Sequence, residues 1–540
     1  TGSLVNAGFS TPYSWKPATG IMYQQRLVLT YGAKVETSRV GFPYNFYRDF
    51  PLSSESALSL KVQGSASNSA DYILRYLESN GLVVFATNGI WVSVGALSPN
   101  NLNLQNRGEW VIDNSVPPIS IPGGVLFIDS KTNTVRSLTW SEENATYYAD
   151  EVSIFSDHLF VEKRVKSWAF QDGAFPLLWV TFNDGTYASF TYERSQEMRA
   201  WTRHDSGTDI DFVVGFTQQK IAVPVPYFSG IIFVTKDVNN IRNIELGIAR
   251  YATGEEMEDN PDIDKSQLAA AMDSMVSWES LVNDSLVGND ELEISTVVPG
   301  DWTGELKVTC GTSGIFTAAY APVGTKFKYF DPDDKSEYLM TVIRRENNNE
   351  IICEPDIEVP DDIENFRLYK CKSTFDGLDH LEGENVSVMV DGAVVASPNN
   401  PAYSTIVTVE NGEITLPNDM VGAIVHIGRP YVSDVETLDI DTIEQHPTLI
   451  ESLTLNKLYI KVHRTRGFFI GNTFPENDSV EGMQELSDIA VNYEEENPII
   501  GNRPPQPVTK RLEVTLPGDW KSQGRVCIRY VDPVHFEILS

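Results

Sequence analysis

The sequence predicts a mainly β protein with a propeller-like body of repeated antiparallel hairpins, inserted small β domains and one short acidic helical segment. Short apolar runs separated by Asn-Gly or Asp-Gly turns favour this class. The runs also recur at similar spacing, with starts 55, 43, 53 and 53 residues apart at Leu27, Leu82, Val125, Leu178 and Ile231. Such spacing is typical of sheets with three or four strands, as in propeller blades. A β-sandwich of consecutive hairpins is the competing architecture.

The segment from Leu178 to His204 is the clearest of these modules. Two apolar runs flank the turn Asn183 to Thr186, and a third run, rich in aromatic and polar residues, ends at His204. The Asp-Gly pair in the turn supplies the positive φ that a tight reversal needs, and the flanking residues are β-branched or aromatic. We therefore expect three consecutive antiparallel strands here. The tryptophans on such strands, including Trp91 and Trp140, are expected to pack in cores.

The pattern of repeated hairpins changes after residue 250, and five regions can be distinguished. We expect blades at 1–250, an acidic helical insertion at 251–300, a small all-β insertion domain at 301–372, a further β domain at 373–445, and C-terminal strands at 446–540. These last strands are candidates to close the propeller by completing the sheet that begins near Arg26.

The acidic insertion contains twelve Asp or Glu residues and one Lys between Tyr251 and Gly300. Apolar residues recur at spacings of three and four along Lys265 to Leu286. This pattern predicts an amphipathic helix, with Asp262 or Asp264 as its cap. Its apolar face is expected to pack either elsewhere on this chain or on a neighbouring subunit.

The strong acidity of the 540-residue chain limits its partners. A formal net charge of −34 repels nucleic acid, which argues against sequence-specific DNA or RNA binding but allows DNA to pass beside a repelling wall. The alternative is that acidity only keeps an abundant protein soluble. No apolar run approaches the length of a membrane span. The opening TGSLVNAGFS has neither an initiator Met nor a visible signal peptide, so we expect a processed or truncated N-terminus.

The cysteines and the acidic turns show no strong metal signature. There is no CxxC pair and no His at metal-ligand spacing, so we expect reduced, buried thiols, with a disulfide among the first three as the alternative. The cysteines are Cys310, Cys353, Cys371 and Cys527. One acidic turn is a candidate for Ca²⁺ but lacks the Gly and the distal Glu of an EF-hand, which favours solvated loop charge. Its acids are Asp331, Asp333, Asp334 and Glu337.

Two polar clusters invite a catalytic interpretation, and for both a structural one is favoured. The first opens a predicted strand and contains Asp379, His380, Glu382 and Glu384. It lacks the two-His spacing of a zinc helix, so we expect a turn with a hydrogen-bonded His. The second contains Glu193, Arg194, Glu197, Arg203 and His204. There, Glu197 is expected to pair with Arg199 or with a neighbouring strand.

No GxSxG, HExxH or phosphate-binding glycine loop is present. We therefore predict that the protein is not an enzyme. No catalytic, cofactor-binding or metal-binding residue is assigned, and no cofactor is expected.

Five segments stand out in order along the chain: TGIMYQQRLVLTYG, SRVGFPYNF, DGTYASFTYERSQEMRAWTRHD, DGLDHLEGENVSVMVDGAVV and GDWKSQGRVCIRYVDPVHFEIL. Together they resemble the nozzle proteins of short-tailed bacteriophages, also called tail tubular protein B. The departures are Val534-His535 in place of the usual Leu-Pro, and a loose match over Asp301 to Lys372.

The resemblance implies a structural tail protein in the virion, assembled in the bacterial cytoplasm. It would form a ring, usually a hexamer, that contacts the adaptor and portal side and carries tail fibres or spikes. Double-stranded DNA would pass through the ring without sequence-specific binding. The alternative is a host-surface carbohydrate-binding or glycan-cleaving β-propeller, which exposed aromatic residues on loops would favour.

Overall fold

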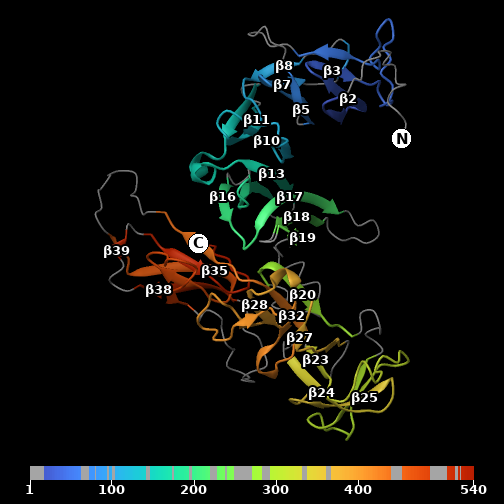
Figure 1. Ribbon diagram of the computed structural model, residues 1–540, viewed down its shortest axis with the longest axis vertical. Helices are drawn as coiled ribbons and strands as arrows, with labels where there is room; N and C mark the ends of the chain where they lie inside the picture. The colour runs from blue at the N-terminus through green and yellow to red at the C-terminus, as the bar shows by residue number, and fades with distance from the viewer. Residues whose placement is uncertain are drawn as a thin grey trace. The chain divides into compact units, whose positions relative to one another are not determined.

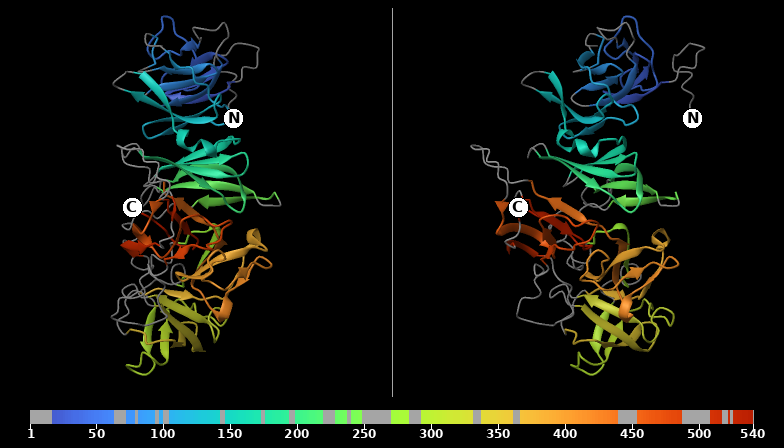
Figure 2. Two further views of the ribbon diagram at one scale, coloured as in Figure 1. Left: turned by 90° about the vertical axis from the view of Figure 1, so that its left-hand side faces the viewer. Right: turned by 60° about the vertical axis from the view of Figure 1, so that its left-hand side comes forward.

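A computed structural model provides the structure of the chain (Figures 1 and 2). It describes residues 17–62, 72–78, 81–93, 97–99, 104–141, 146–172, 176–193, 198–218, 228–236, 240–247, 270–282, 292–330, 337–360, 366–438, 453–486, 508–516, 521–522 and 525–539. The chain divides into two compact units, Thr1–Ala252 and Thr253–Ser540. Figure 2 colours the strands of the first unit from blue to green and those of the second from yellow-green to red.

The described residues of the first unit form five antiparallel sheets that follow one another along the chain (Figure 1). The first is β1 (Gly20–Tyr23), β2 (Arg26–Tyr31), β3 (Lys34–Thr37) and β4 (Ser59–Lys61), and the second is β5 (Ile73–Glu78), β6 (Leu82–Ala86), β7 (Gly89–Ser93) and β8 (Gln105–Gly108). The third is β9 (Ile119–Ile121), β10 (Gly124–Asp129), β11 (Thr134–Ser141) and β12 (Thr146–Glu151), followed by the 3-10 helix η2 (Ile154–Leu159). The fourth is β13 (Val165–Gln171), β14 (Leu177–Phe182), β15 (Tyr187–Glu193) and β16 (Met198–His204), and the fifth is β17 (Asp209–Gln218), β18 (Phe228–Lys236) and β19 (Arg242–Gly247).

Each of these sheets is a meander in which consecutive strands pair. The first strand of each sheet also contacts the first strand of the next, so that β1 meets β5, β5 meets β9, β9 meets β13 and β13 meets β17. In a β-propeller, four-stranded meanders are repeated in this way around a centre. The predicted fold class, a mainly β protein with a propeller-like body of antiparallel sheets, is confirmed.

Successive sheets share hydrophobic cores, which explains the unbroken apolar runs in the sequence. Strand β6 is buried along its whole length. Its residues Leu82 and Val84 face the core shared with the first sheet, whereas Val83 and Phe85 face the core shared with the third. A strand covered on both faces does not alternate between apolar and polar residues. The tryptophans behave as expected, since Trp91 is buried and Trp140 packs against the second of these cores.

The hairpin from Leu178 to His204 forms as predicted. Strands β14 and β15 pair with Thr181 opposite Tyr187, and β15 pairs with β16 up to Tyr187 opposite His204. Gly185 in the turn has a φ of +86°. A Cβ atom there would also lie 2.5 Å from the Asp209 carboxylate, so the turn requires glycine for two separate reasons.

The second unit begins with strand β20 (Asp273–Glu279) and a six-stranded sheet. The sheet has the order β21-β22-β25-β24-β23-β26 and a core of its own that includes Phe316, Phe327 and Met340. Its strands are β21 (Glu293–Thr296), β22 (Leu306–Thr309), β23 (Lys326–Phe330), β24 (Glu337–Arg345), β25 (Glu350–Pro355) and β26 (Leu368–Lys370).

A second core of this unit lies around the strands that follow. They are β27 (Thr374–Phe375), β28 (Asn385–Val390), β29 (Ala393–Ala396), β30 (Val407–Thr408), β31 (Ile414–Thr415) and β32 (Ile424–Arg429), with the 3-10 helices η5 (Asp379–Leu381) and η6 (Pro417–Asp419). Strands β20, β32, β28 and β29 pair in that order, and β30 also pairs with β28. The C-terminal strands are β33 (Ser433–Glu436), β34 (Leu453–Thr454), β35 (Lys457–Thr465), β36 (Phe469–Gly471), β37 (Gln484–Glu485), β38 (Val508–Thr515), β39 (Lys521–Ser522) and β40 (Cys527–Tyr530).

The expectation that the C-terminal strands complete the first sheet is wrong for the described residues. Strand β40 pairs with β33 and β36, β38 pairs with β35, and β39 pairs with β34. The apolar side chains of these strands share a core with Met389 of β28, and Ala270 forms a β-bridge with Val534. The end of the chain is therefore used within the second unit.

The predicted helix over Lys265 to Leu286 is wrong over Asp273–Glu279, which is strand β20. The apolar residues of this segment enter four separate cores: Met272 in the C-terminal core, Val276 and Trp278 in the β28 core, Leu281 beside Tyr369, and Val282 in the six-stranded sheet. A β-bulge between Asp273 and Val276 also shifts the register. The spacing of three and four residues therefore arises because the apolar side chains enter different cores and the bulge shifts the register, and it does not reflect one face of a helix. The proposed caps, Asp262 and Asp264, lie outside the described residues.

Candidate functional site

Among the described residues, the connection between β3 and β4 carries a group of exposed aromatic side chains. We call residues 39–55 the aromatic loop. Five large apolar residues in it are exposed, with relative accessibilities of 63% for Phe42, 73% for Tyr44, 66% for Tyr47, 101% for Phe50 and 52% for Leu52. Single exposed apolar residues are common, whereas five within one short loop make that loop a candidate interaction surface.

Arg26 of β2 holds both ends of this loop together. Its guanidinium is buried, with 1% of the residue exposed. Nη1 donates to the carbonyl oxygens of Ser38 and Ser56, both at 2.8 Å, and Nη2 donates to that of Ser54 at 2.6 Å. Ser38 precedes the loop, while Ser54 and Ser56 lie at its exit. A buried arginine is stable only when its donors are paired, and here backbone carbonyls provide the pairing.

Three of the four charged side chains of the loop form ion pairs within the chain. Arg39 pairs with Asp49 at 3.3 Å, and the hydroxyl of Ser56 donates to the same carboxylate at 2.8 Å. Arg48 pairs with Glu36 of β3 at 2.6 Å. Burial raises the pKa of Glu36, but its hydrogen bonds outweigh that effect and the pKa is lowered. The loop thus presents aromatic faces while its charges stabilise its own fold.

Backbone hydrogen bonds fix the tip of the loop as well. The N–H of Arg39 donates to the Asn45 carbonyl at 2.8 Å, and the N–H of Asn45 donates to the Phe42 carbonyl at 3.0 Å. The Asn45 side chain accepts from the N–H of Tyr47 at 2.9 Å. The exposed rings are therefore carried on an ordered frame, which reduces the entropy lost when they bind a partner.

The cluster around His380 is a structural joint. The carboxylate of Glu384 accepts two hydrogen bonds from Arg429, at 2.6 and 2.7 Å, and that arginine is 7% exposed. Glu382 accepts from the N–H groups of Asn411 and Gly412, and His380 Nε2 lies 3.0 Å from the carbonyl oxygen of Ser274. The acids hold a turn and a buried arginine in place, as a structural interpretation of this cluster predicts.

The charged row at the end of the fourth sheet is also occupied within the sheet. His204 Nε2 lies 2.7 Å from the Ser189 hydroxyl, and its ring stacks on Tyr187 with centroids 5.0 Å apart. Arg203 donates to Asp205 at 3.1 Å. Arg194 and Glu197 lie outside the described residues, so the expected pairing of Glu197 with Arg199 stays a prediction.

A buried ion triad joins the six-stranded sheet to the hairpin after β28. Lys328 of β23 contacts the carboxylates of Glu337, at 2.9 Å, and Asp391. Burial lowers the pKa of Lys328, but the two carboxylates outweigh it and raise the pKa. The other oxygen of Asp391 accepts from the N–H groups of Ala423 and Ile424, at 3.0 and 2.7 Å. Every ion has partners, so the triad is a structural link.

The described part of the chain contains no group of three His, Cys, Asp or Glu residues placed to hold a metal. Of the Ca²⁺ candidates, Asp331, Asp333 and Asp334 lie outside the described residues, and Glu337 belongs to the triad. All four cysteines are buried free thiols, as expected. Burial raises the pKa of Cys353 to about 12. Among the described residues, no helix is long and apolar enough to cross a membrane.

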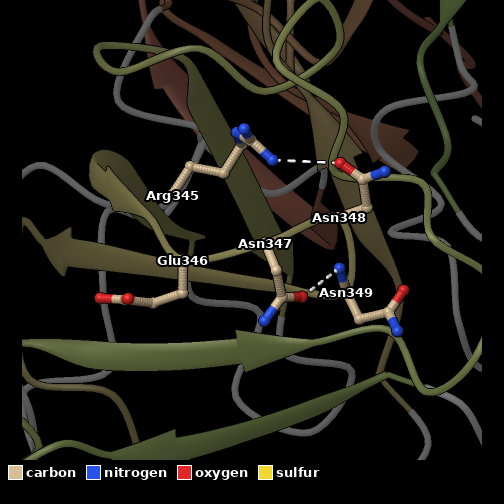
Figure 3. Close-up of a pocket in the computed structure, with 5 residues that line it drawn as sticks. All are labelled: Arg345, Glu346, Asn347, Asn348 and Asn349. Atoms are coloured by element: carbon tan, nitrogen blue, oxygen red, sulfur yellow. Dashed lines mark hydrogen bonds between the residues drawn. The ribbon is translucent and has the colours of Figure 1, made fainter.

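A shallow polar hollow lies at the turn between β24 and β25 (Figure 3). It is lined by Arg345, Glu346, Asn347, Asn348 and Asn349. Arg345 donates to the Asn348 side chain at 3.1 Å, and the N–H of Asn349 donates to the Asn347 side chain at 2.7 Å (Figure 3). The lining residues bind one another, and no titratable pair there resembles a catalytic site.

The aromatic loop was missed as a site by sequence reasoning, which used SRVGFPYNF only as a mark of resemblance. The available signal was five aromatic residues between Phe42 and Phe50 without strand alternation, beside Gly and Pro. Aromatic residues so placed have no strand face to bury them.

No protein-family model and no curated protein sequence matches this chain. Similar solved structures include the WD40 domain of SCAP from fission yeast, at 8% identity and a TM-score of 0.27 over 75% of this chain and 82% of that one. Raptor from Chaetomium thermophilum is similar at 12% identity and a TM-score of 0.25 over 64% of this chain and 28% of that one. These scores are too low to carry an argument, so the description of the fold rests on the strand order and the shared cores.

Proposed function

We propose that this chain is a structural component of a bacteriophage tail. Several copies, six in the usual arrangement of the family it resembles, form a nozzle ring in the virion. The ring conducts and retains genomic DNA, and it connects the adaptor and portal side to distal tail parts such as fibres or spikes.

The observation that carries this proposal is the role of the residues in the resembling segments. Arg26 of QQRLVLTYG binds the carbonyl of Ser38, at the start of SRVGFPYNF, so the first two resembling segments meet at one buried contact. Glu384 of DGLDHLEGE binds the buried Arg429. Motif residues of an enzyme converge on a cavity that holds substrate. Here they secure turns and loops, which is the role expected of them in a rigid wall.

The charge supports passage of DNA rather than binding. At −34 per chain, six copies carry a formal charge of about −200. Such a wall repels the phosphate backbone, so DNA would slide through the channel without adhering.

Electron microscopy of the purified full chain, alone and with its tail adaptor, tests the proposal. We expect rings with sixfold symmetry in at least one of the two samples. A chain that stays monomeric in both and cleaves glycans would contradict it.

Carbohydrate binding by a host-surface propeller is the second candidate, and the aromatic loop is the observation that favours it. Exposed rings of this kind can stack on sugars. A glycan array probed with the full chain and with the Tyr44→Ser variant tests this second candidate function. Glycan binding that is lost in the variant would support this candidate, and absence of binding by the wild-type chain would exclude the glycans tested.

A further inference from the structure

We propose that the aromatic loop is a contact between neighbouring copies of this chain, seating its exposed rings on the adjacent subunit. This inference rests on the proposed function, because it assigns the loop to the interface between neighbouring subunits of the ring. Three features of the loop lead to this partner: its exposed area, its charge and its internal order.

The exposed apolar area matches one side of a stable interface. The accessibilities of Phe42, Tyr44, Tyr47 and Phe50 together equal about three fully exposed aromatic residues. At about 200 Å² for each, this is roughly 600 Å² before Leu52 is added. A standard protein–protein interface buries about 800 Å² on each partner. The loop alone therefore supplies most of one side.

The charge of the loop favours a partner that is itself acidic. Two chains at −34 each repel one another, so contact between copies needs a surface that adds no negative charge. From Val40 to Leu52 the only charged residues are Arg48 and Asp49, which balance. Both form ion pairs within the chain: Arg48 pairs with Glu36, and Asp49 pairs with Arg39. A basic partner would favour carboxylates among the exposed rings, and the one carboxylate between Val40 and Leu52, that of Asp49, is paired with Arg39.

The same pairing argues against a sugar as the occupant. Carbohydrate sites combine an aromatic platform with polar groups that fix the orientation of the bound ligand. In the aromatic loop, Arg39 and Asp49 bind each other, and the Asn45 side chain accepts from the N–H of Tyr47. The charged groups beside the rings are thus already paired, and the exposed rings, with the hydroxyls of Tyr44 and Tyr47, lie on an ordered frame, which suits a protein surface with an apolar centre.

Sedimentation velocity of the full chain over a range of concentrations tests the contact. The variant Tyr44→Ser/Phe50→Ser removes two exposed rings of the loop, and Phe155→Ser/Leu438→Ser removes two side chains that are 96% and 90% exposed elsewhere. We expect the loop variant to weaken self-association about 100-fold or more, because each buried aromatic side chain contributes about tenfold or more. The control variant should associate like the wild type. Both should unfold at the wild-type temperature, because all four side chains lie at the surface.

A second measurement identifies the neighbour directly. Replacing Phe50 with the photo-crosslinking residue p-benzoylphenylalanine should give crosslinked dimers and higher species whose peptides come from this chain alone. A loop variant that assembles like the wild type would overturn the loop contact while leaving the ring intact. Crosslinks only to the adaptor, or glycan binding that depends on the loop, would overturn it in favour of another occupant. If the wild-type chain is monomeric at all concentrations, the two variants are compared by electron microscopy in the adaptor sample. There, rings formed by the loop variant as readily as by the wild type would overturn the loop contact, whereas a wild type that forms no rings would overturn the proposed function.

Discussion

Removing Arg26 should loosen the aromatic loop and destabilise the first unit. In Arg26→Met the apolar stem is largely kept, and three hydrogen bonds, at 2.6 to 2.8 Å, are lost. A hydrogen bond to a charged group contributes about 1.5–3 kcal/mol, which would sum to roughly 4.5–9 kcal/mol. The carbonyls at the loop base can regain water if the loop opens, so we expect a net loss of about 3–5 kcal/mol, at or below the lower end of that sum.

Two assays on the full chain measure this loss. The thermal unfolding midpoint of the first unit should fall by about 6–20 °C, at about 2–4 °C per kcal/mol for a domain of this size. Chymotrypsin should cleave the variant in the loop, after Tyr44, Phe46 or Tyr47, under conditions in which the wild type resists. Arg48→Met is the control, because Arg48 makes one pair with Glu36 and its side chain is 48% exposed, so it should lose about 1 kcal/mol or less. Equal stability and equal proteolysis of Arg26→Met and the wild type would refute the role of Arg26.

Three further predictions follow from the buried charges and thiols. Lys328→Met should reduce the free energy of unfolding of the second unit, measured by urea titration, by about 3–5 kcal/mol, because Asp391 and Glu337 lose their cation. Lys307→Met is the control, since the pair of Lys307 with Glu350 spans 3.9 Å at the surface, and it should change this free energy by less than about 1 kcal/mol. Equal effects of the two substitutions would contradict the role of the ion triad as a structural link. The pKa of Glu36 is lowered in the folded state, so its ionised carboxylate contributes stability above the ordinary pKa of 4.5, and this contribution is lost as the pH falls through the folded-state pKa. Glu36→Gln should therefore be less stable than the wild type at pH 7 and should approach the wild-type stability below pH 4.5. A stability difference that does not depend on pH would count against this role of Glu36. Finally, burial raises the pKa of Cys353 to about 12, so iodoacetamide at pH 8 should leave this thiol unmodified in the native chain and alkylate it only after unfolding, as peptide mass spectrometry can measure.

Local sequence signals predicted the first unit well because its structure is local. The turns at Asn88-Gly89 and Asp184-Gly185 join strands that pair with their immediate neighbours in the chain. In a meander, turn chemistry and apolar runs are sufficient to place each strand. The propeller-like class followed from the regular spacing of these hairpins.

The signals failed where a segment serves distant partners. Strand β20 was predicted as a helix because Met272, Val276 and Leu281 enter different cores, so their spacing reflects no single face. The C-terminal strands were assigned to the wrong sheet because their pairing depends on long-range contacts that spacing does not encode. The aromatic loop was overlooked for a third reason: what orders it is Arg26, a residue whose role depends on carbonyl groups 12 to 30 residues away.

The shared cores of the first unit have a consequence for how it tolerates loss of a part. Because Leu126 and Val125 of the third sheet face different neighbours, deleting that sheet would leave two apolar faces uncovered, one on the second sheet and one on the fourth. Stability in such a stack is a sum over adjoining pairs, so an interior sheet counts twice and a terminal sheet once. A pulling force or a protease acting on this unit would therefore remove sheets from its ends inward, and a truncation would be tolerated only where it ends the stack.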